Sequence, residues 1–243
     1  ADAATVALSN DGTIKALAIA YATGTDTAEY GGGTVYAYAV EQSGYGISAD
    51  LSLVNGGLIE AWAAAHIYAT DAANPTFASA NGVYQHVSTG AGSIDLYNDG
   101  SIVATAAVTA TAFYYAGTHS YAAVTGVDQI ARGSSAALTL TNHGTISGTA
   151  SFKAVSTGGQ ASASAFASGA NQIADASGLN TVDLYNDGSI TATGSADAEA
   201  ATNAYAYAEA TGVDQEGFGS EARLHLVNHG IISADATASA DPE

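Results

Sequence analysis

Aspartate and histidine alternate at one position of a repeated motif. The motif is Asn-x-Gly-x-Ile, and the residue between its Asn and Gly carries a carboxylate or an imidazole in four successive copies: Asp99, His143, Asp187 and His229. Both groups are ligands for metals such as Zn²⁺ and Ca²⁺, so a stacked column of them is a candidate metal site between turns, with Ca²⁺ an acceptable ion. Asp and His also suit tight turns and attract each other when the imidazole is protonated. The sequence favours this turn chemistry, and we expect no resident cofactor.

A second set of candidate residues is aromatic. Outward positions in the segments after the motif carry large side chains in the early repeats, and we single out Tyr21, Trp62 and Tyr68. Exposed rings can stack on sugars or pack against a partner. Strands also favour aromatic residues on a solvated face. A module that binds glycans, or host or cell-surface components, through this aromatic face is therefore an alternative function.

Paired carboxylates are the remaining candidate catalytic groups. Asp95 and Asp99 recur as Asp183 and Asp187. Four strand residues separate the members of each pair, about 13 Å, which exceeds the separations that glycosidases use. We therefore assign no catalytic residues and expect no enzymatic activity. A polysaccharide-degrading β-helix enzyme that depends on Asp99 is the alternative.

Composition excludes several other classes. The chain has 243 residues, with 23 acidic and 4 basic side chains and a formal net charge of −19. It lacks the cationic surface that neutralises phosphates, so we expect no nucleic-acid partner. It contains no Cys for disulfides or thiolate chemistry, and no run of 18 apolar residues that would span a membrane as a helix. The lack of an initiator Met indicates a processed product or an excised fragment.

The elements that must position these residues form an internal repeat. The motif recurs at intervals of 42 to 45 residues, and its Asn residues are Asn10, Asn55, Asn98, Asn142, Asn186 and Asn228. Apolar residues alternate before each Asn, and small residues, mostly Ala, alternate after it, which is the period of a strand with one buried face. A second landmark, preceded two residues earlier by Val or Ala, is formed by Gln42, Gln85, Gln129, Gln172 and Gln215. The inward phase shifts by one residue just before it, as at Gly212, which predicts a bend or bulge.

A unit of strands repeated end to end predicts an all-β parallel β-helix, or β-solenoid, with about 44 residues per repeat. Residues 1–243 would form a single domain of five full repeats plus a C-terminal half repeat. We expect right-handed winding, an Ala-lined interior with larger residues at the corners, and inward-facing Asn and Gln ladders bonded from turn to turn. The spacing allows one turn per repeat, or two turns of about 22 residues each.

The repeat resembles those of a known group of proteins. Leu-x-Asn-x-Gly-x-Ile-x-Ala-x-Ala, followed by Ala-x-Ala-x-Gly-Val-x-Gln, is similar to the repeat regions of bacterial autotransporter passengers and haemagglutinin-like adhesins, and the likeness extends from Thr5 to Ala240. This resemblance implies a Cys-poor, acidic, right-handed β-helix that is extracellular or displayed at the bacterial cell surface.

The function that we expect from these patterns is structural. A solenoid whose terminal turns leave strand edges unpaired offers templates for another chain, around Val6 and Leu8 at one end and after Leu224 at the other. We therefore expect the chain to associate with itself head to tail, as part of a fibre or a cell-surface stalk.

Overall fold

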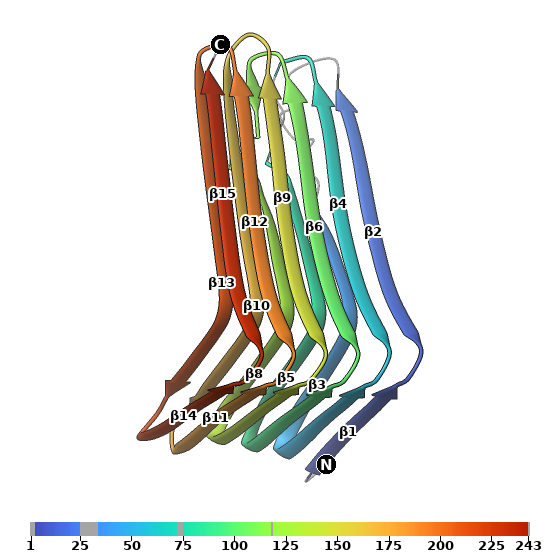
Figure 1. Cartoon of the computed structure of the whole chain (residues 1–243), viewed down its shortest axis with the longest axis vertical. Helices are drawn as coiled ribbons and strands as arrows, with labels where there is room; N and C mark the ends of the chain where they lie inside the picture. Colours follow the sequence, from blue (N-terminus) through green and yellow to red (C-terminus); the bar gives the residue numbers. More distant parts are fainter. Residues whose placement is uncertain (1–2, 25–33, 72–74, 118, 243) are drawn as a thin grey trace.

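The computed structural model describes residues 3–24, 34–71, 75–117 and 119–242. Within these ranges the regular elements are all β-strands, and every strand pairing is parallel. The strands form two sheets that face each other along the body of the molecule (Figure 1). The predicted parallel β-solenoid is therefore confirmed.

We call the six-stranded sheet the straight sheet. Each of its strands follows one copy of the Asn-x-Gly turn, and each is 12 residues long. They are β2 (Thr13–Gly24), β4 (Leu58–Ala69), β6 (Ser101–Ala112), β9 (Thr145–Ser156), β12 (Ser189–Ala200) and β15 (Ile231–Pro242).

We call the nine-stranded sheet the bent sheet. Its longest strands run through 22 residues and change direction part way along, so that their second halves form a foot below the straight sheet (Figure 1). In the later turns this path is divided between two strands. The strands are β1 (Ala3–Asn10), β3 (Thr34–Asn55), β5 (Phe77–Asn98), β7 (Tyr115–Ala116), β8 (Tyr121–Asn142), β10 (Gln160–Ala176), β11 (Leu179–Asn186), β13 (Asn203–Phe218) and β14 (Glu221–Asn228).

Each repeat makes one turn. Asn55 pairs with Asn98, and Asn98 with Asn142, so equivalent residues of successive repeats lie on neighbouring strands. The alternative of two shorter turns per repeat is therefore wrong, because one strand carries the chain through the bend without closing a turn there. In Figure 1 the chain rises through the straight sheet, descends through the sheet behind it and advances from β2 toward β15, which is a right-handed winding.

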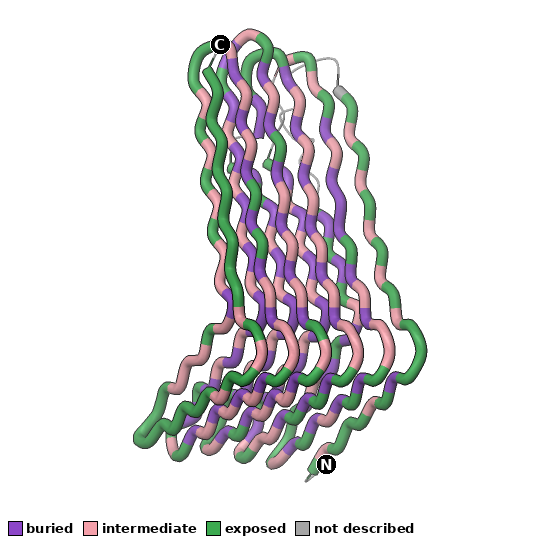
Figure 2. Tube along the Cα trace, viewed as in Figure 1, coloured by how far each residue is buried: buried purple, intermediate pink, exposed green. Residues whose placement is uncertain are grey.

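The interior changes composition along the cross-section. Between the straight sheet and the first halves of the long strands, the buried residues are mainly Ala, as at Ala61, Ala104 and Ala165. Leu, Ile and Val fill the junction, where Leu96 and Ile102 are fully buried, and the foot, where Ile94 and Leu138 are. Buried and less buried residues alternate along most strands, whereas the last strands are largely exposed (Figure 2). The Ala-lined wall and the larger residues near the corners agree with the sequence analysis.

Glycines occupy the bend from the second turn onward, where the first turn has Ala39. Gly82 and Val83 are both buried although they are consecutive, and so are Gly126 and Val127, which is the predicted shift in phase. A Cβ at Gly126 would lie 2.6 Å from the carbonyl oxygen of Gly169 and 2.7 Å from Cγ2 of Ile146. At Gly126 the bend therefore leaves no room for a Cβ unless neighbouring atoms shift.

We predict that Gly126→Ala destabilises the fold by about 1 to 3 kcal/mol, because the added methyl group overpacks this contact. Urea denaturation measures the change. Gly12→Ala is the matched control, since a Cβ there meets only Oδ1 of Asn10 at 4.0 Å, and we expect it to stay within about 0.5 kcal/mol of the parent. Equal midpoints for the parent and Gly126→Ala would show that the close approach does not constrain the bend.

Candidate functional site

The predicted Asn ladder runs through the solenoid at the corner between the foot and the straight sheet. Nδ2 of Asn55 donates to Oδ1 of Asn98 at 2.7 Å, and Nδ2 of Asn98 donates to Oδ1 of Asn142 at 2.7 Å. The same bond links the remaining neighbours, from Asn10 to Asn55 and from Asn142 through Asn186 to Asn228. Each amide thus donates to the turn that follows it in the chain.

The Gln ladder crosses the interior of the foot. Nε2 of Gln85 donates to Oε1 of Gln42 at 2.7 Å, and Nε2 of Gln129 donates to Oε1 of Gln85 at 3.0 Å. Gln172 and Gln215 continue the series. In this column each amide donates to the turn that precedes it. The two ladders therefore run in opposite directions, which the sequence did not predict.

Both ladders also bond to the backbone. Nδ2 of Asn142 reaches the carbonyl oxygen of Gly144 at 3.3 Å, which holds the turn closed, and that of Ser189 in the next turn at 3.3 Å. Nε2 of Gln129 reaches the carbonyl oxygen of Thr139 at 3.2 Å, which joins the two layers of the foot. A buried amide needs such partners. The ladders are therefore structural elements of the corner and the foot.

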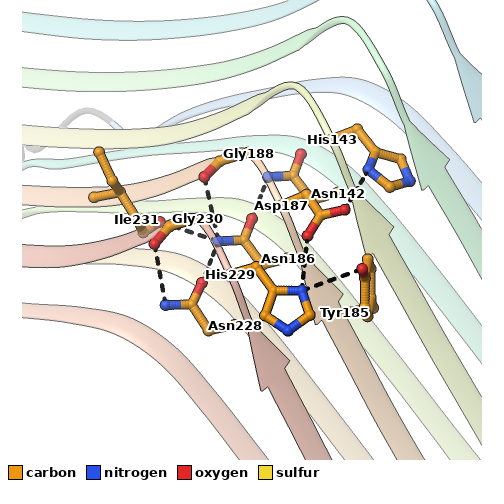
Figure 3. A network of polar contacts seen from close by, with 10 residues as sticks. All are labelled: Asn142, His143, Tyr185, Asn186, Asp187, Gly188, Asn228, His229, Gly230 and Ile231. Carbon is orange, nitrogen blue, oxygen red and sulfur yellow. Dashed lines mark hydrogen bonds and ion pairs between the residues drawn. The ribbon is translucent and has the colours of Figure 1, made fainter.

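The Asp and His column lies on the outside of the Asn-Gly corner, as predicted. One carboxylate joins two imidazoles: Oδ2 of Asp187 lies 3.3 Å from Nδ1 of His143, and its Oδ1 lies 3.2 Å from Nδ1 of His229 (Figure 3). The hydroxyl of Tyr185 also lies 3.3 Å from Nδ1 of His229. The pKa of Tyr185 is raised, chiefly because its hydroxyl bonds to Asp187.

Asp99 has a different partner. The pKa of Tyr97 is raised, chiefly by a hydrogen bond between its hydroxyl and Asp99. Among the described residues, no group of three or more His, Asp or Glu side chains converges as a metal ion would require. Turn geometry and pairing with neighbouring Tyr and His residues account for the contacts of this column, and a metal in it stays a prediction.

The three predicted aromatic residues share the outer face of the straight sheet. The exposed fractions are 73% for Tyr21, 43% for Trp62 and 50% for Tyr68. Tyr21 stacks on His66 with ring centroids 5.0 Å apart, and Leu17 lies beside Trp62 on the neighbouring strand. The residues are thus exposed together on β2 and β4. A ligand for this face stays a prediction.

The sequence analysis missed a second aromatic group on the outer face of the bent sheet. Tyr36 stacks on Tyr38 at 6.4 Å, Tyr38 contacts Tyr84 edge-on at 6.0 Å, and Tyr84 stacks on His86 at 6.3 Å. Tyr45 also contacts His86, edge-on, with ring centroids 5.9 Å apart. The signal was present in the sequence, because these residues occupy outward positions on both sides of the phase shift.

The same outer face carries a half-buried carboxylate. Asp128 follows Tyr84 in register on β8, and its Oδ1 accepts a hydrogen bond from Nδ2 of Asn171 at 2.9 Å. Burial raises the pKa of Asp128 to about 6, and the bond from Asn171 opposes that rise. Asp128 lies where the bent sheet changes direction. A carboxylate with a shifted pKa at such a place marks a candidate binding site.

Comparisons with known proteins add no evidence on function, which is therefore argued from the fold and the site geometry. No protein-family model, no curated protein and no solved structure matches this chain. Within the described ranges no helix is long and apolar enough to cross a membrane.

We predict that Asn142→Leu destabilises the fold by about 1 to 3 kcal/mol, because Nδ2 of Asn98 loses its side-chain acceptor and Oδ1 of Asn186 loses its side-chain donor in a buried corner. Thermal or urea denaturation measures the loss. Thr141→Leu, at the neighbouring and less buried position of β8, is the matched control. A variant at position 142 as stable as this control would contradict a structural role for the ladder.

We predict that Asp128→Asn raises stability at pH 7 but not at pH 4. The folded state raises the pKa of Asp128 from 3.8 to about 6, so folding favours the protonated carboxyl, and the stability that it contributes is lost as pH rises from about 4 through 6. The neutral amide avoids that loss, and the gain should be about 1 to 2 kcal/mol after allowance for solvent screening. Urea denaturation at both pH values measures it, and an equal gain at both would contradict the assignment.

Proposed function

We propose that this chain is a non-enzymatic structural β-solenoid of the extracellular space or the bacterial cell surface, which continues end to end with a second copy of itself in a fibre or stalk. The observation that carries the proposal is the direction of the Asn ladder, which ends in an amide donor at the C-terminal face and an amide acceptor at the N-terminal face. It gives the two end faces complementary hydrogen-bonding groups.

The end faces present donors and acceptors in matching places. Nδ2 of Asn228 donates to the carbonyl oxygen of Gly230, and the described residues hold no further ladder acceptor for it. At the other end, Oδ1 of Asn10 accepts a bond from its own turn, at the backbone nitrogen of Gly12, and none from another Asn. The Gln column is reversed, and its end members, Gln215 on β13 and Gln42 on β3, do not meet in this contact, because no strand of the second copy follows β13.

The strands at the two faces also correspond. β14 and β15 have the same lengths, 8 and 12 residues, as β1 and β2, and both pairs flank an Asn-x-Gly turn. Inward-facing leucines remain uncovered at the C-terminal face, where Leu224 is 47% exposed and Leu226 is 44% exposed. Stacking β1 and β2 of one copy on β14 and β15 of another would cover them. The strand that would continue β13 has no counterpart in this contact, so the interface is a half turn and should be weak.

Charge favours axial contact over lateral contact. The net charge of −19 makes two copies repel each other, which opposes side-by-side aggregation. In an end-to-end contact, by contrast, Asp11 of one copy would follow His229 of the other and continue the alternation of Asp99, His143, Asp187 and His229. The resemblance of the repeats to those of surface adhesins supports the proposed location.

We predict that the purified chain forms end-to-end oligomers whose average mass rises with protein and salt concentration, because salt screens the repulsion. Light scattering measures the mass, and negative-stain images distinguish linear rods from clusters. Leu226→Glu should abolish the oligomers by placing a charge on the end face. Val227→Glu, which adds the same charge at the neighbouring position of β14, should retain them. A parent that stays monomeric at high protein and salt concentration would contradict self-association.

A further inference from the structure

The outer face of the bent sheet is hollowed where its strands turn from the body into the foot. A groove of about 320 Å³ lies there, and it crosses successive strands along the solenoid axis. Thr125, Ser168 and Thr211 line it on one side of the bend, and Asn171 and Asp214 line it on the other. Because these residues pair in register on β8, β10 and β13, the groove repeats similar polar groups from turn to turn.

The groove contains polar groups that the fold itself does not use fully. Oγ of Ser168 is buried and has no hydrogen-bond partner in the described structure. Asp128 and Asp214 lie on either side of Asn171 in the same column, and Asn171 uses one of its two Nδ2 hydrogens on Asp128. A ligand with hydroxyl groups could donate to the carboxylates, accept from the amide and satisfy the serine.

Aromatic rings extend this surface on both sides. Phe166 lines the groove and contacts Tyr207 with ring centroids 5.6 Å apart. Toward the first turns the column of Asp128 leads to Tyr84, which contacts Tyr38 and His86. Nε2 of His86 is also buried without a partner in the described structure. Aromatic faces beside hydroxyl-bonding groups suit a ligand with both apolar C–H faces and hydroxyls.

Charge and backbone geometry narrow the class of ligand. The charged side chains that line the groove, Glu209 and Asp214, are acidic, and Asp128 adds a third carboxylate nearby, so an anionic ligand is disfavoured. The backbone of β8 and β10 is paired on both sides within the sheet, so a peptide cannot bind this face by adding a strand. Side chains on successive turns, spaced about 4.8 Å apart, must therefore recognise the ligand.

We propose that this groove binds a neutral glycan chain laid along the solenoid axis, with its hydroxyl groups on Asp128, Ser168, Asn171 and Asp214 and its sugar faces on Phe166 and the ring cluster around Tyr84. The advance of an extended pyranose chain per sugar is close to the spacing of the turns, so successive sugars meet equivalent positions. The site is distinct from the aromatic residues of the straight sheet and from the end faces.

Isothermal titration calorimetry with cellohexaose, maltohexaose and chitohexaose tests the proposal, with hexagalacturonate as the anionic comparison. We expect at least one neutral hexasaccharide to bind with a Kd below about 1 mM. Ser168→Tyr fills the groove from an outward position and should weaken binding at least about tenfold. Asn171→Ala removes a bonding group without adding bulk and should weaken it as well.

Two controls locate the site. Ser195→Tyr makes the same substitution on the outer face of the straight sheet, on β12, and should leave the affinity unchanged. Trp62→Ala removes the aromatic residue that was predicted to bind a ligand on the straight sheet, and it should also leave the affinity unchanged. Thermal denaturation establishes that each variant is folded.

Three results would overturn the proposal. The first is failure of every neutral hexasaccharide to bind at about 5 mM. The second is binding that is lost in Trp62→Ala but kept in folded Ser168→Tyr and Asn171→Ala, which would place the glycan on the straight sheet. The third is binding of hexagalacturonate as tight as that of the neutral chains, which would contradict the role of the carboxylates.

Discussion

The in-register parallel pairing of successive turns is the constraint on which the rest of the structure depends. Along the paired strands, residues of one turn lie beside their equivalents in the next, as Leu51 lies beside Ile94 and Ile94 beside Leu138. A side chain that faces inward must therefore fit against its own kind at the strand spacing of about 4.8 Å. Apolar residues satisfy this by packing. An inward polar residue satisfies it only when its copies can bond to one another.

Amides meet that condition because they both donate and accept. Asn98, Asn142, Gln85 and Gln129 are fully buried, yet each bonds to its equivalents in the neighbouring turns. A carboxylate column in the same place would repel itself and would have no donor. The Asp and His alternation outside the corner follows the same rule, since Asp187 can bond to His143 and His229 but not to another Asp.

The sequence predicted the fold well because the same motif recurs six times. The spacing of the Asn residues predicted the stacking, the alternation predicted the buried faces, and the phase shift at Gly126 and Gly212 predicted the bend. The number of turns per repeat could not be predicted, because a bulge and a turn both shift the alternation of apolar residues by one position. The pairing across the sheet, Gln85 with Gln129, resolves it.

The candidate sites were harder to predict. The columns of Asp and His and of Asn could be placed, since their members share one motif position. The groove could not, because its members Asp128, Asn171 and Ser168 differ in type from turn to turn and come together only through the direction of the bend. The direction of each amide ladder was equally inaccessible, since the sequence gives the two ends of an amide no preference between neighbouring turns.

That opposite direction has an electrostatic consequence for length. In a single column of aligned amides the dipoles add, as they do in a helix, and the two ends acquire opposite partial charges. The free-energy cost of these end charges increases as the column lengthens. Here the Asn column points its N–H groups toward the last turn, and the Gln column points them toward the first. Their axial dipoles offset each other. A solenoid of this design can gain turns without accumulating a macrodipole, so the cost of adding one more repeat does not depend on how many precede it.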